Sequence, residues 1–294
     1  MKILLLGKNG QVGWELQRSL APLGEVIALG SDIANFTDLA GLADIVRTVA
    51  PDVIVNAAAH TAVDKAESES ELARAINALA PAVLAEEAKR LNAWLVHYST
   101  DYVFDGSGEK PWLETDATGP LSVYGATKLE GEQNIQQSGC KHLIFRTSWV
   151  YGARGGNFAR TMLRLAQERD TLKVIDDQIG APTGADLLAD VTAHAIRTAQ
   201  RNPDVSGLYH LVAGGNISWH GYASFVLEYA RRSGVELKAE TIEPVPTCAF
   251  PTPARRPHNS RLNTDKLRRM FDLNLPHWQA GVERMLTEIL VSGK

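Results

Sequence analysis

The chain alternates short, almost continuously apolar runs with longer segments in which apolar residues recur every three or four positions. The apolar runs predict strands at 2–6, 25–29, 52–56, 93–99 and 141–148, and the amphipathic segments predict helices at 11–21, 38–49, 64–90 and 122–138. Strands that are apolar along their whole length are typical of a parallel sheet covered by helices on both faces. The pattern therefore predicts an α/β fold with a doubly wound parallel sheet.

Beyond residue 150 this alternation becomes looser. The periodicity predicts helices at 157–169, 184–200 and 218–233, short strands at 172–176 and 207–212, and a proline-rich segment at 244–257. We expect a sheet domain over 1–150 and a smaller, interleaved α/β lobe over 151–294, with some of the later segments returning to the first sheet.

Composition narrows the class of partner. The 294 residues are 45% hydrophobic and 22% charged, with a formal charge of −4, and neither sign of charge forms a long block. Nucleic-acid and membrane surfaces are therefore disfavoured as partners, and a small molecule is expected. The apolar run at the amino terminus is too short for a signal peptide or a membrane span. The two cysteines, Cys140 and Cys248, form no disulfide or metal pattern, which favours a cytoplasmic location.

A glycine-rich turn follows the first predicted strand, where Gly7, Gly10 and Gly13 open the first helix in the spacing GxxGxxG. Glycine at these positions permits a tight turn, the approach of a pyrophosphate to the backbone and close helix packing, while free N–H groups face the anion. The placement on the first strand-to-helix turn predicts a dinucleotide site.

The second and third strands are expected to border the same dinucleotide. After the second strand, Asp32 could bind the ribose diol or cap the following turn, whereas Gly30 and Ser31 leave room for a 2′-phosphate, so the choice between NADH and NADPH stays open. Asn35 and Phe36 are expected beside the adenine. Small residues after the third strand, up to Ala59, indicate either close approach of the cofactor or tight helix packing.

Tyr124 and Lys128 lie four residues apart on a predicted helix, so they share one face. An ammonium beside a phenol, together with an oxidised nicotinamide, would lower the phenol's pKa toward neutrality and fit it for proton transfer. The alternative is a solvated helix face. Thr100, at the end of the fourth strand, is expected to bind a substrate carbonyl oxygen beside Tyr124, and Ser99 is a weaker candidate.

These motifs together resemble the extended short-chain dehydrogenase/reductases. The stretches NAAAHTAVDKAE, STDYVFDG, RTSWVYG, DQIGAPTGADLLAD, GLYHLVAGG and ARRPHNSRLNTDKL further resemble the dTDP-4-dehydrorhamnose reductase family over nearly the whole chain. The resemblance implies a Rossmann domain over 1–150 and a sugar-nucleotide lobe over 151–294. It also implies an oxidoreductase in which NADPH or NADH reduces the C4 ketone of dTDP-4-dehydro-L-rhamnose, the last step toward dTDP-L-rhamnose for cell-surface polysaccharide.

The resemblance also carries residue roles. Tyr124 would be the proton donor, assisted by Lys128 and Thr100. Contacts with the cofactor are implied for Gly10, Gln11, Val12, Ala59, His60, Thr61, Tyr124 and Lys128, and contacts with the sugar nucleotide for Thr100, Asp101, Tyr102, Trp149 and Arg256. A core position for Trp149 and a solvated surface position for Arg256 are the alternatives. A homodimer with a structural Mg²⁺ held by Glu15, Asp186 and Glu288 is also implied.

Two other functions remain open on the same scaffold. A sugar-nucleotide epimerase or dehydratase would keep NAD bound and recycle its hydride, and dehydratases usually place a glutamate where this chain has Tyr102. A non-catalytic regulatory subunit would not need the group formed by Thr100, Tyr124 and Lys128. The sequence therefore favours a net reductase.

Overall fold

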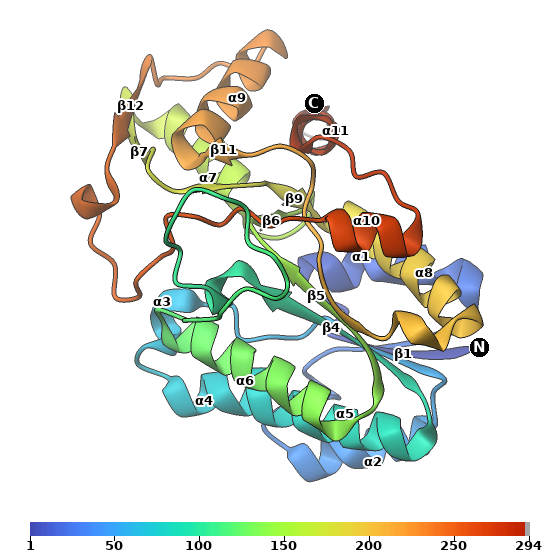
Figure 1. Cartoon of the computed structure of the whole chain (residues 1–294). Coiled ribbons are helices and arrows are strands. Elements are labelled where there is room, and N and C mark those ends of the chain that lie inside the picture. The colour runs from blue at the N-terminus through green and yellow to red at the C-terminus, as the bar shows by residue number, and fades with distance from the viewer. Residues whose placement is uncertain (292–294) are drawn as a thin grey trace.

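The computed structural model describes residues 1–291, so the last three residues of the predicted lobe lie outside the described part. A six-stranded, fully parallel sheet forms its centre (Figure 1). The strands lie in the order β2-β1-β3-β4-β5-β10, with bounds Glu25–Leu29, Lys2–Leu6, Val53–Asn56, Trp94–Thr100, Lys141–Thr147 and Gly207–His210. The chain order reverses at β1, which opens a crevice at the carboxyl edge where α/β proteins bind ligands.

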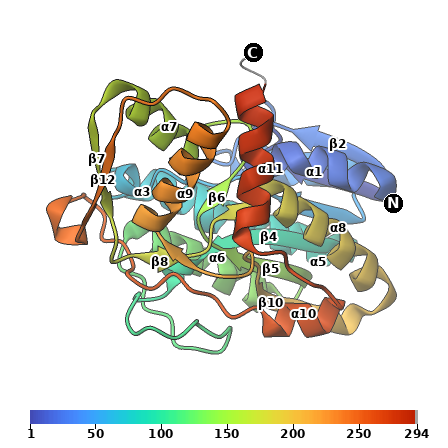
Figure 2. The same cartoon turned by 90° about the horizontal axis from the view of Figure 1, so that it is seen from above.

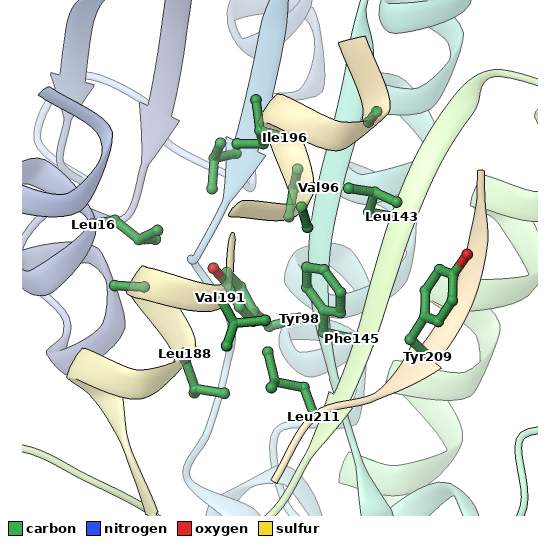
Figure 3. Close-up of a cluster of buried hydrophobic side chains, with 14 of the residues drawn as sticks. Leu16, Val96, Tyr98, Leu143, Phe145, Leu188, Val191, Ile196, Tyr209 and Leu211 are labelled. Carbon is green, nitrogen blue, oxygen red and sulfur yellow. The ribbon is translucent and has the colours of Figure 1, made fainter. Parts of the chain in front are cut away.

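Helices cover both faces of this sheet, as the sequence pattern predicts. On one face lie α1 (Gln11–Leu20), α8 (Ala185–Arg201) and α10 (Asp265–Phe271), and on the other lie α2 (Leu39–Val49), α5 (Ala80–Leu91) and α6 (Val123–Ser138) (Figure 1). Successive residues of a strand point to opposite faces, so Ile3 and Leu5 join the first core while Leu4 and Leu6 join the second. Figure 3 shows the first core, where Leu188 and Val191 of α8 face Phe145 of β5.

A second lobe lies beyond the carboxyl edge of the sheet and has its own core, which includes Tyr222 and Trp278 (Figure 2). Its helices are α7 (Phe158–Glu168), α9 (Trp219–Arg232) and α11 (Trp278–Val291), beside the parallel pair β7 (Thr171–Ile175) and β12 (Thr241–Val245). Two further pairs of short strands are β6 (Val150–Tyr151) with β9 (Thr183–Gly184) and β8 (Ile179–Gly180) with β11 (Ile217–Ser218). Single 3₁₀ turns occur at Ala21–Leu23, Asp101–Val103, Pro203–Val205 and Thr247–Ala249. No helix within residues 1–291 has the length and apolar character needed to cross a membrane.

The structure differs from the sequence-based expectation in several elements, and α10, α11 and the two-residue strands of the lobe were not predicted. The segment expected as one helix at 64–90 is divided into α3 (Val63–Ala66), α4 (Ser70–Arg74), a π-helical turn (Ala75–Leu79) and α5. The backbone N–H and hydroxyl of Ser68 bond the Lys65 carbonyl and end α3, while Pro81 lacks the N–H that would continue the α-helical ladder. The strand expected at 207–212 is β10 and pairs with β5 of the central sheet. The strand β12, which the pattern did not predict, reaches into the proline-rich segment.

A buried ion pair joins α6 to the sheet. Glu132 of α6 accepts two hydrogen bonds from the Arg146 guanidinium of β5, at 2.9 Å from Nε and 2.6 Å from Nη2. Both residues are at most 4% exposed. Arg146 also lies over the Phe104 ring. Because neither charge can reach water, the position of α6 along β5 depends on this pair remaining complete.

We expect Glu132→Ala to lower the free energy of unfolding by about 3–5 kcal/mol, because it leaves the Arg146 charge buried and unpaired. Glu130→Ala is the matched control on the same helix. It removes a solvent-exposed pair with Arg74 and is expected to change stability little. Urea unfolding of both variants measures the difference, and equal losses would contradict the interpretation.

Candidate active site

The turn between β1 and α1 is shaped by its glycines. Gly7 has φ +85°, and a Cβ at this position would lie 2.7 Å from the backbone nitrogen of Ala58. A Cβ on Gly13 would overlap the Gly7 carbonyl oxygen, so the helix can pack this closely only without a side chain there. No side chain caps the amino terminus of α1. Its first N–H groups are therefore available to an anion.

A cavity of about 730 Å³ begins at this turn and continues along the carboxyl ends of the strands to α6 and the lobe. Seventeen of the residues singled out from the sequence line it, namely Gly7, Gly10, Gln11, Val12, Gly30, Ser31, Asn35, Phe36, Ala59, Thr61, Ser99, Thr100, Asp101, Tyr102, Tyr124, Lys128 and Trp149. The cavity thus joins the predicted nucleotide turn to the predicted proton donor.

Three residues expected at the cofactor do not line this cavity. Gly13 is buried beneath the turn, and its lack of a side chain allows α1 to pack closely against Gly7. Asp32 is exposed and lies near Gly30. The side chain of His60 turns to Glu69, with 3.1 Å between its Nε2 and Oε2, while Asn77 bonds the His60 backbone on both sides. Direct contact between the His60 ring and a cofactor in this cavity is therefore not supported.

Thr100 and Tyr124 meet at the centre of the cavity. The Thr100 hydroxyl donates to Asp101 Oδ1 at 3.1 Å, and its interaction with the Tyr124 phenol favours the ionised form of that phenol. Tyr124 is held at the start of α6, whose amino terminus is capped by the Ser122 side chain, and the Tyr102 ring packs edge-on against it at 5.5 Å between centroids. The hydroxyls of Thr100 and Tyr124 can therefore both reach one substrate oxygen.

The expected lowering of the Tyr124 pKa does not occur in the protein alone. Burial of the phenol raises the pKa of Tyr124 to about 12, and the Thr100 hydrogen bond only partly opposes this. The cost of burying a phenolate is the largest contribution in the protein alone, and the expected lowering also includes the charge of an oxidised nicotinamide. Tyr124 therefore holds its proton throughout the neutral range, which suits a proton donor.

Lys128 is buried on the other side of the site, with 2% of its surface exposed. Its Nζ donates to the Tyr98 carbonyl oxygen at 2.6 Å and lies 3.2 Å from His97 Nε2. Burial lowers the pKa of Lys128 to about 8, although the Glu132 carboxylate opposes the shift. The amine is thus fixed in place and titrates near neutral pH.

The residues expected at the sugar nucleotide are placed differently from one another. Asp101 and Tyr102 form the turn after β4 and line the cavity. Trp149, with φ +50°, stacks on Trp219 at 3.5 Å between ring centroids, and a Cβ on Gly180 would meet the Trp149 indole at 2.6 Å. Arg256 does not line the cavity, since its guanidinium bonds Asp64 Oδ2 at 2.7 Å.

The sequence pattern did not identify Trp219 as a site residue. It begins α9 in the second lobe and lines the cavity beside Trp149. No spacing rule relates these two tryptophans, because tertiary packing of the lobe brings them together. Thr147 and Ser148, which also line the cavity, could have been found because Thr147 ends β5 and Ser148 follows it.

The carboxylates expected to hold Mg²⁺ do not gather within one chain. Among residues 1–291, no group of three or more His, Cys, Asp or Glu side chains is placed to hold a metal ion. Glu15 pairs with Arg18, while Asp186 and Glu288 both lie near Arg284, at 3.4 and 3.5 Å. A guanidinium between two of the expected ligands does not fit a metal site in the single chain.

A nucleotide turn and a phenol that keeps its proton share one cavity at the sheet's switch point, the arrangement required for transferring a hydride and a proton to a carbonyl. The chain is an oxidoreductase of the short-chain dehydrogenase/reductase class. A family model described as RmlD substrate binding domain matches residues 1–291.

Individual relatives agree with this match. The chain is 61% identical to the dTDP-4-dehydrorhamnose reductase of Shigella flexneri and 62% identical to that of Salmonella typhimurium, over 99% of each chain. It is also similar to the solved structure of the Bacillus anthracis dTDP-4-dehydrorhamnose reductase in complex with NADP, with TM-score 0.88 and 34% identity over 98% of this chain and 99% of that one. The chain belongs to the dTDP-4-dehydrorhamnose reductase family.

The Asp101 carboxyl provides a test of the site's electrostatics. Burial raises its pKa from 3.8 to about 6, against hydrogen bonds from Ser260 and Thr100. Ionisation of Asp101 therefore destabilises the folded protein above pH 6. Below the pKa of the carboxyl in the unfolded chain, near 4, it has no such effect. We expect Asp101→Asn to be about 2–3 kcal/mol more stable than the unsubstituted protein at pH 7.5, and the difference to vanish near pH 4.

Asp105→Asn is the control for this experiment. A hydrogen bond from the Ser107 backbone lowers the pKa of the exposed Asp105, so its removal is not expected to stabilise the protein at pH 7.5. Urea unfolding across pH 4–8 measures both variants. If the difference in unfolding free energy between Asp101→Asn and the unsubstituted protein does not change with pH, burial does not raise the pKa of this carboxyl.

Proposed function

We propose that the chain catalyses the NAD(P)H-dependent reduction of the C4 ketone of dTDP-4-dehydro-L-rhamnose to dTDP-L-rhamnose. This is the last step in making the activated rhamnose used for cell-surface polysaccharide. The observation that carries the proposal is the single cavity that Gly10, Thr100 and Tyr124 all line. Relatives at 61% identity with the name dTDP-4-dehydrorhamnose reductase support the choice of substrate.

The glycine turn fits a dinucleotide. Gly7, Gly10, Gln11 and Val12 would hold the pyrophosphate, Asn35 and Phe36 the adenosine part, and Ala59 and Thr61 the part near the nicotinamide. When bound, the reduced cofactor supplies the hydride. Gly30 and Ser31, which line the cavity, leave space beside the ribose 2′ position, so both NADPH and NADH are proposed as donors.

The chain's own residues would handle the proton. Tyr124 would donate H⁺ to the oxygen of the C4 ketone as the hydride arrives at the carbon. The Thr100 hydroxyl, after turning from Asp101, would donate a hydrogen bond to the same oxygen. The raised pKa of Tyr124 keeps the donor protonated until that moment. Lys128, fixed by the Tyr98 carbonyl, orients the cofactor and returns a proton to the phenolate.

The sugar nucleotide would lie between the two lobes. Asp101 and Tyr102 would contact the sugar, and Trp149 with Trp219 would offer an apolar stacking surface. We propose that segment 151–294 supplies this lobe while β10 and α8 return to the domain begun by residues 1–150. Arg256 could pair with the diphosphate only after leaving Asp64.

We expect the purified protein to consume reduced nicotinamide when mixed with the 4-keto sugar nucleotide. Tyr124→Phe should lower kcat by about 10²–10⁴, because the proton donor is lost, while cofactor affinity is retained. Tyr229→Phe, which removes a hydroxyl that bonds Thr287 in the second lobe, is the control and should keep full activity. Absorbance of the reduced nicotinamide measures turnover, separately with NADPH and NADH.

The same assay separates the alternatives. A lack of consumption with either donor would remove the reductase assignment. An epimerase or dehydratase would instead convert its sugar nucleotide without net oxidation of the donor, and a regulatory subunit would lose no activity with Tyr124→Phe.

We expect Gly7→Ala to weaken NADPH binding roughly tenfold or more, because the new Cβ meets the Ala57–Ala58 backbone at a φ of +85°. Gly156→Ala is the matched control, since its Cβ would meet nothing within 4 Å. Calorimetric titration measures both affinities. Equal affinities for the two variants would argue against binding at this turn.

We also propose a cytoplasmic homodimer in which any Mg²⁺ is structural and shared between chains, as the family resemblance implies. Its ligands would be Glu15, Asp186 and Glu288, after displacement of Arg284. Removal of Mg²⁺ by a chelator is then expected to lower the mass measured by light scattering. The turnover of the protein that is still dimeric should not change. A turnover that falls on chelation without any change in mass would contradict the structural role.

A further inference from the structure

A glycine-rich loop of the second lobe rests on the turn that opens α1. This loop, residues 152–157, follows β6 and ends at Asn157, whose side chain caps α7. A Cβ on Gly152 would lie 3.4 Å from Gln11 Oε1, and a Cβ on Gly155 would lie 3.4 Å from Gln11 Cγ. Asn157 Nδ2 also lies 3.4 Å from Gln11 Oε1. The 152–157 loop is therefore in direct contact with a residue of the proposed pyrophosphate site.

Arg154, in the middle of this loop, is a cation without a carboxylate partner. Its guanidinium carbon lies 3.5 Å from the centroid of the Trp14 ring, so the cation covers one face of the indole. Within residues 1–291, no acidic side chain forms an ion pair with Arg154. Glu15, which follows Trp14 on α1, is paired with Arg18 instead. The five N–H donors of a guanidinium lie in its plane, so contact through one face leaves them available to an anion.

A second cavity, of about 270 Å³, lies between the 152–157 loop and α1. Its lining residues are Asn9, Gln11, Trp14, Arg154 and Gly155. Asn9 and Gln11 also line the first cavity, so the two cavities adjoin at the glycine turn. Asn9 Nδ2 lies 2.8 Å from the place that a Cβ on Gly30 would take, and Gly30 borders the proposed ribose 2′ position. Arg154 therefore lies beside the space that the phosphates of the cofactor are proposed to occupy.

The charges around the second cavity favour an anionic ligand. The amino terminus of α1 is the positive end of the helix dipole, it has no side-chain cap, and its first turn holds no acidic residue. Arg154 adds a full positive charge beside it. Positive groups held side by side repel one another unless an anion lies between them. A phosphate group supplies that anion, and it accepts hydrogen bonds both from backbone N–H groups and from a guanidinium.

We propose that Arg154, oriented by the Trp14 ring, binds a phosphate group of the dinucleotide. The inference rests on the proposed dinucleotide site and adds to it a cofactor contact from the second lobe. Two parts of the cofactor share this chemistry, the pyrophosphate beside Gln11 and, in NADPH, the 2′-phosphate toward which Asn9 extends. Trp14 is a positioning residue, since it acts on the phosphate only through the guanidinium that it orients.

Cofactor binding is measured on the full-length protein without substrate, by calorimetric titration with NADPH and with NADH. We expect Arg154→Ala to weaken binding about tenfold, because a charge-assisted contact is lost, and Arg154→Lys to weaken it less. A loss with both cofactors assigns Arg154 to the pyrophosphate, and a loss with NADPH alone assigns it to the 2′-phosphate. Arg164→Ala, which removes an exposed pair with Glu168 on α7, is the control and should change neither affinity. Unchanged affinity for both cofactors in Arg154→Ala would overturn the proposal.

The role of Trp14 is measured by a double-mutant cycle on the same affinities. We expect Trp14→Leu to weaken binding about threefold in the unsubstituted protein and to have no effect in Arg154→Ala, where no guanidinium is left to orient. Trp14→Phe keeps an aromatic face and should retain most of the affinity. If the two losses simply add in the double variant, Trp14 acts on the cofactor without Arg154, which would overturn its positioning role.

These measurements also separate this inference from the proposed function. If the 4-keto sugar nucleotide is not reduced but Arg154→Ala loses cofactor affinity, only the substrate assignment fails. If reduction occurs while Arg154→Ala keeps its affinity for both cofactors, only the role of Arg154 fails. A lower mass of Arg154→Ala in light scattering, with both affinities unchanged, would also overturn the proposal and would place Arg154 at a contact between copies of the chain.

Discussion

The attachment of α6 to the sheet is the constraint on which the site depends. The helix places Tyr124 in the cavity at its first turn, Lys128 one turn later and Glu132 after one more. Glu132 bonds Arg146 of β5 and Lys128 bonds the Tyr98 carbonyl of β4. Polar bonds to two neighbouring strands, made out of contact with water, hold the helix against both sliding and rotation. The Tyr124 phenol is therefore held beside Thr100 at the end of β4.

Burial has opposite effects on the two titrating groups of α6. It disfavours the charged form of each, which for a phenol is the deprotonated form and for an amine the protonated form. The pKa of Tyr124 therefore rises to about 12 while that of Lys128 falls to about 8. The phenol therefore stays protonated at neutral pH, while the amine titrates close to it. Burial likewise disfavours the charged form of Asp101, which lowers the stability of the folded protein at neutral pH.

The cavity also depends on contacts between the two lobes. Trp149 takes a left-handed backbone conformation directly after β5 and stacks on Trp219 of α9, with Gly180 leaving room for the indole. A strained tryptophan persists only where its surroundings hold it. Both indoles line the cavity, so the second lobe contributes to its shape.

The sequence by itself determined the elements and their chemistry. A strand buried on both faces is apolar along its whole length, and a helix buried on one face has apolar residues every three or four positions. These two patterns predicted the five strands before residue 150 and the helix that carries Tyr124 and Lys128. The ends of parallel strands meet at one edge, so Gly7, Thr100 and Trp149 could be assigned to one site. The division of 64–90 escaped prediction, because a π turn before Pro81 is a local adjustment within a helical pattern.

Tertiary structure alone decided the partners and the protonation of the site. The sequence gives no sign that His60 turns to Glu69, that Arg256 pairs with Asp64 across 192 positions, or that Trp219 stacks on Trp149. Nor could it predict that Tyr124 keeps its proton, since the sign of the pKa shift depends on how completely the phenol is removed from water. The spacing of apolar residues along the chain indicates which side of a helix or strand is buried. The packing of elements that are distant in the chain decides which group lies opposite that side. It also decides how completely water is excluded from the contact.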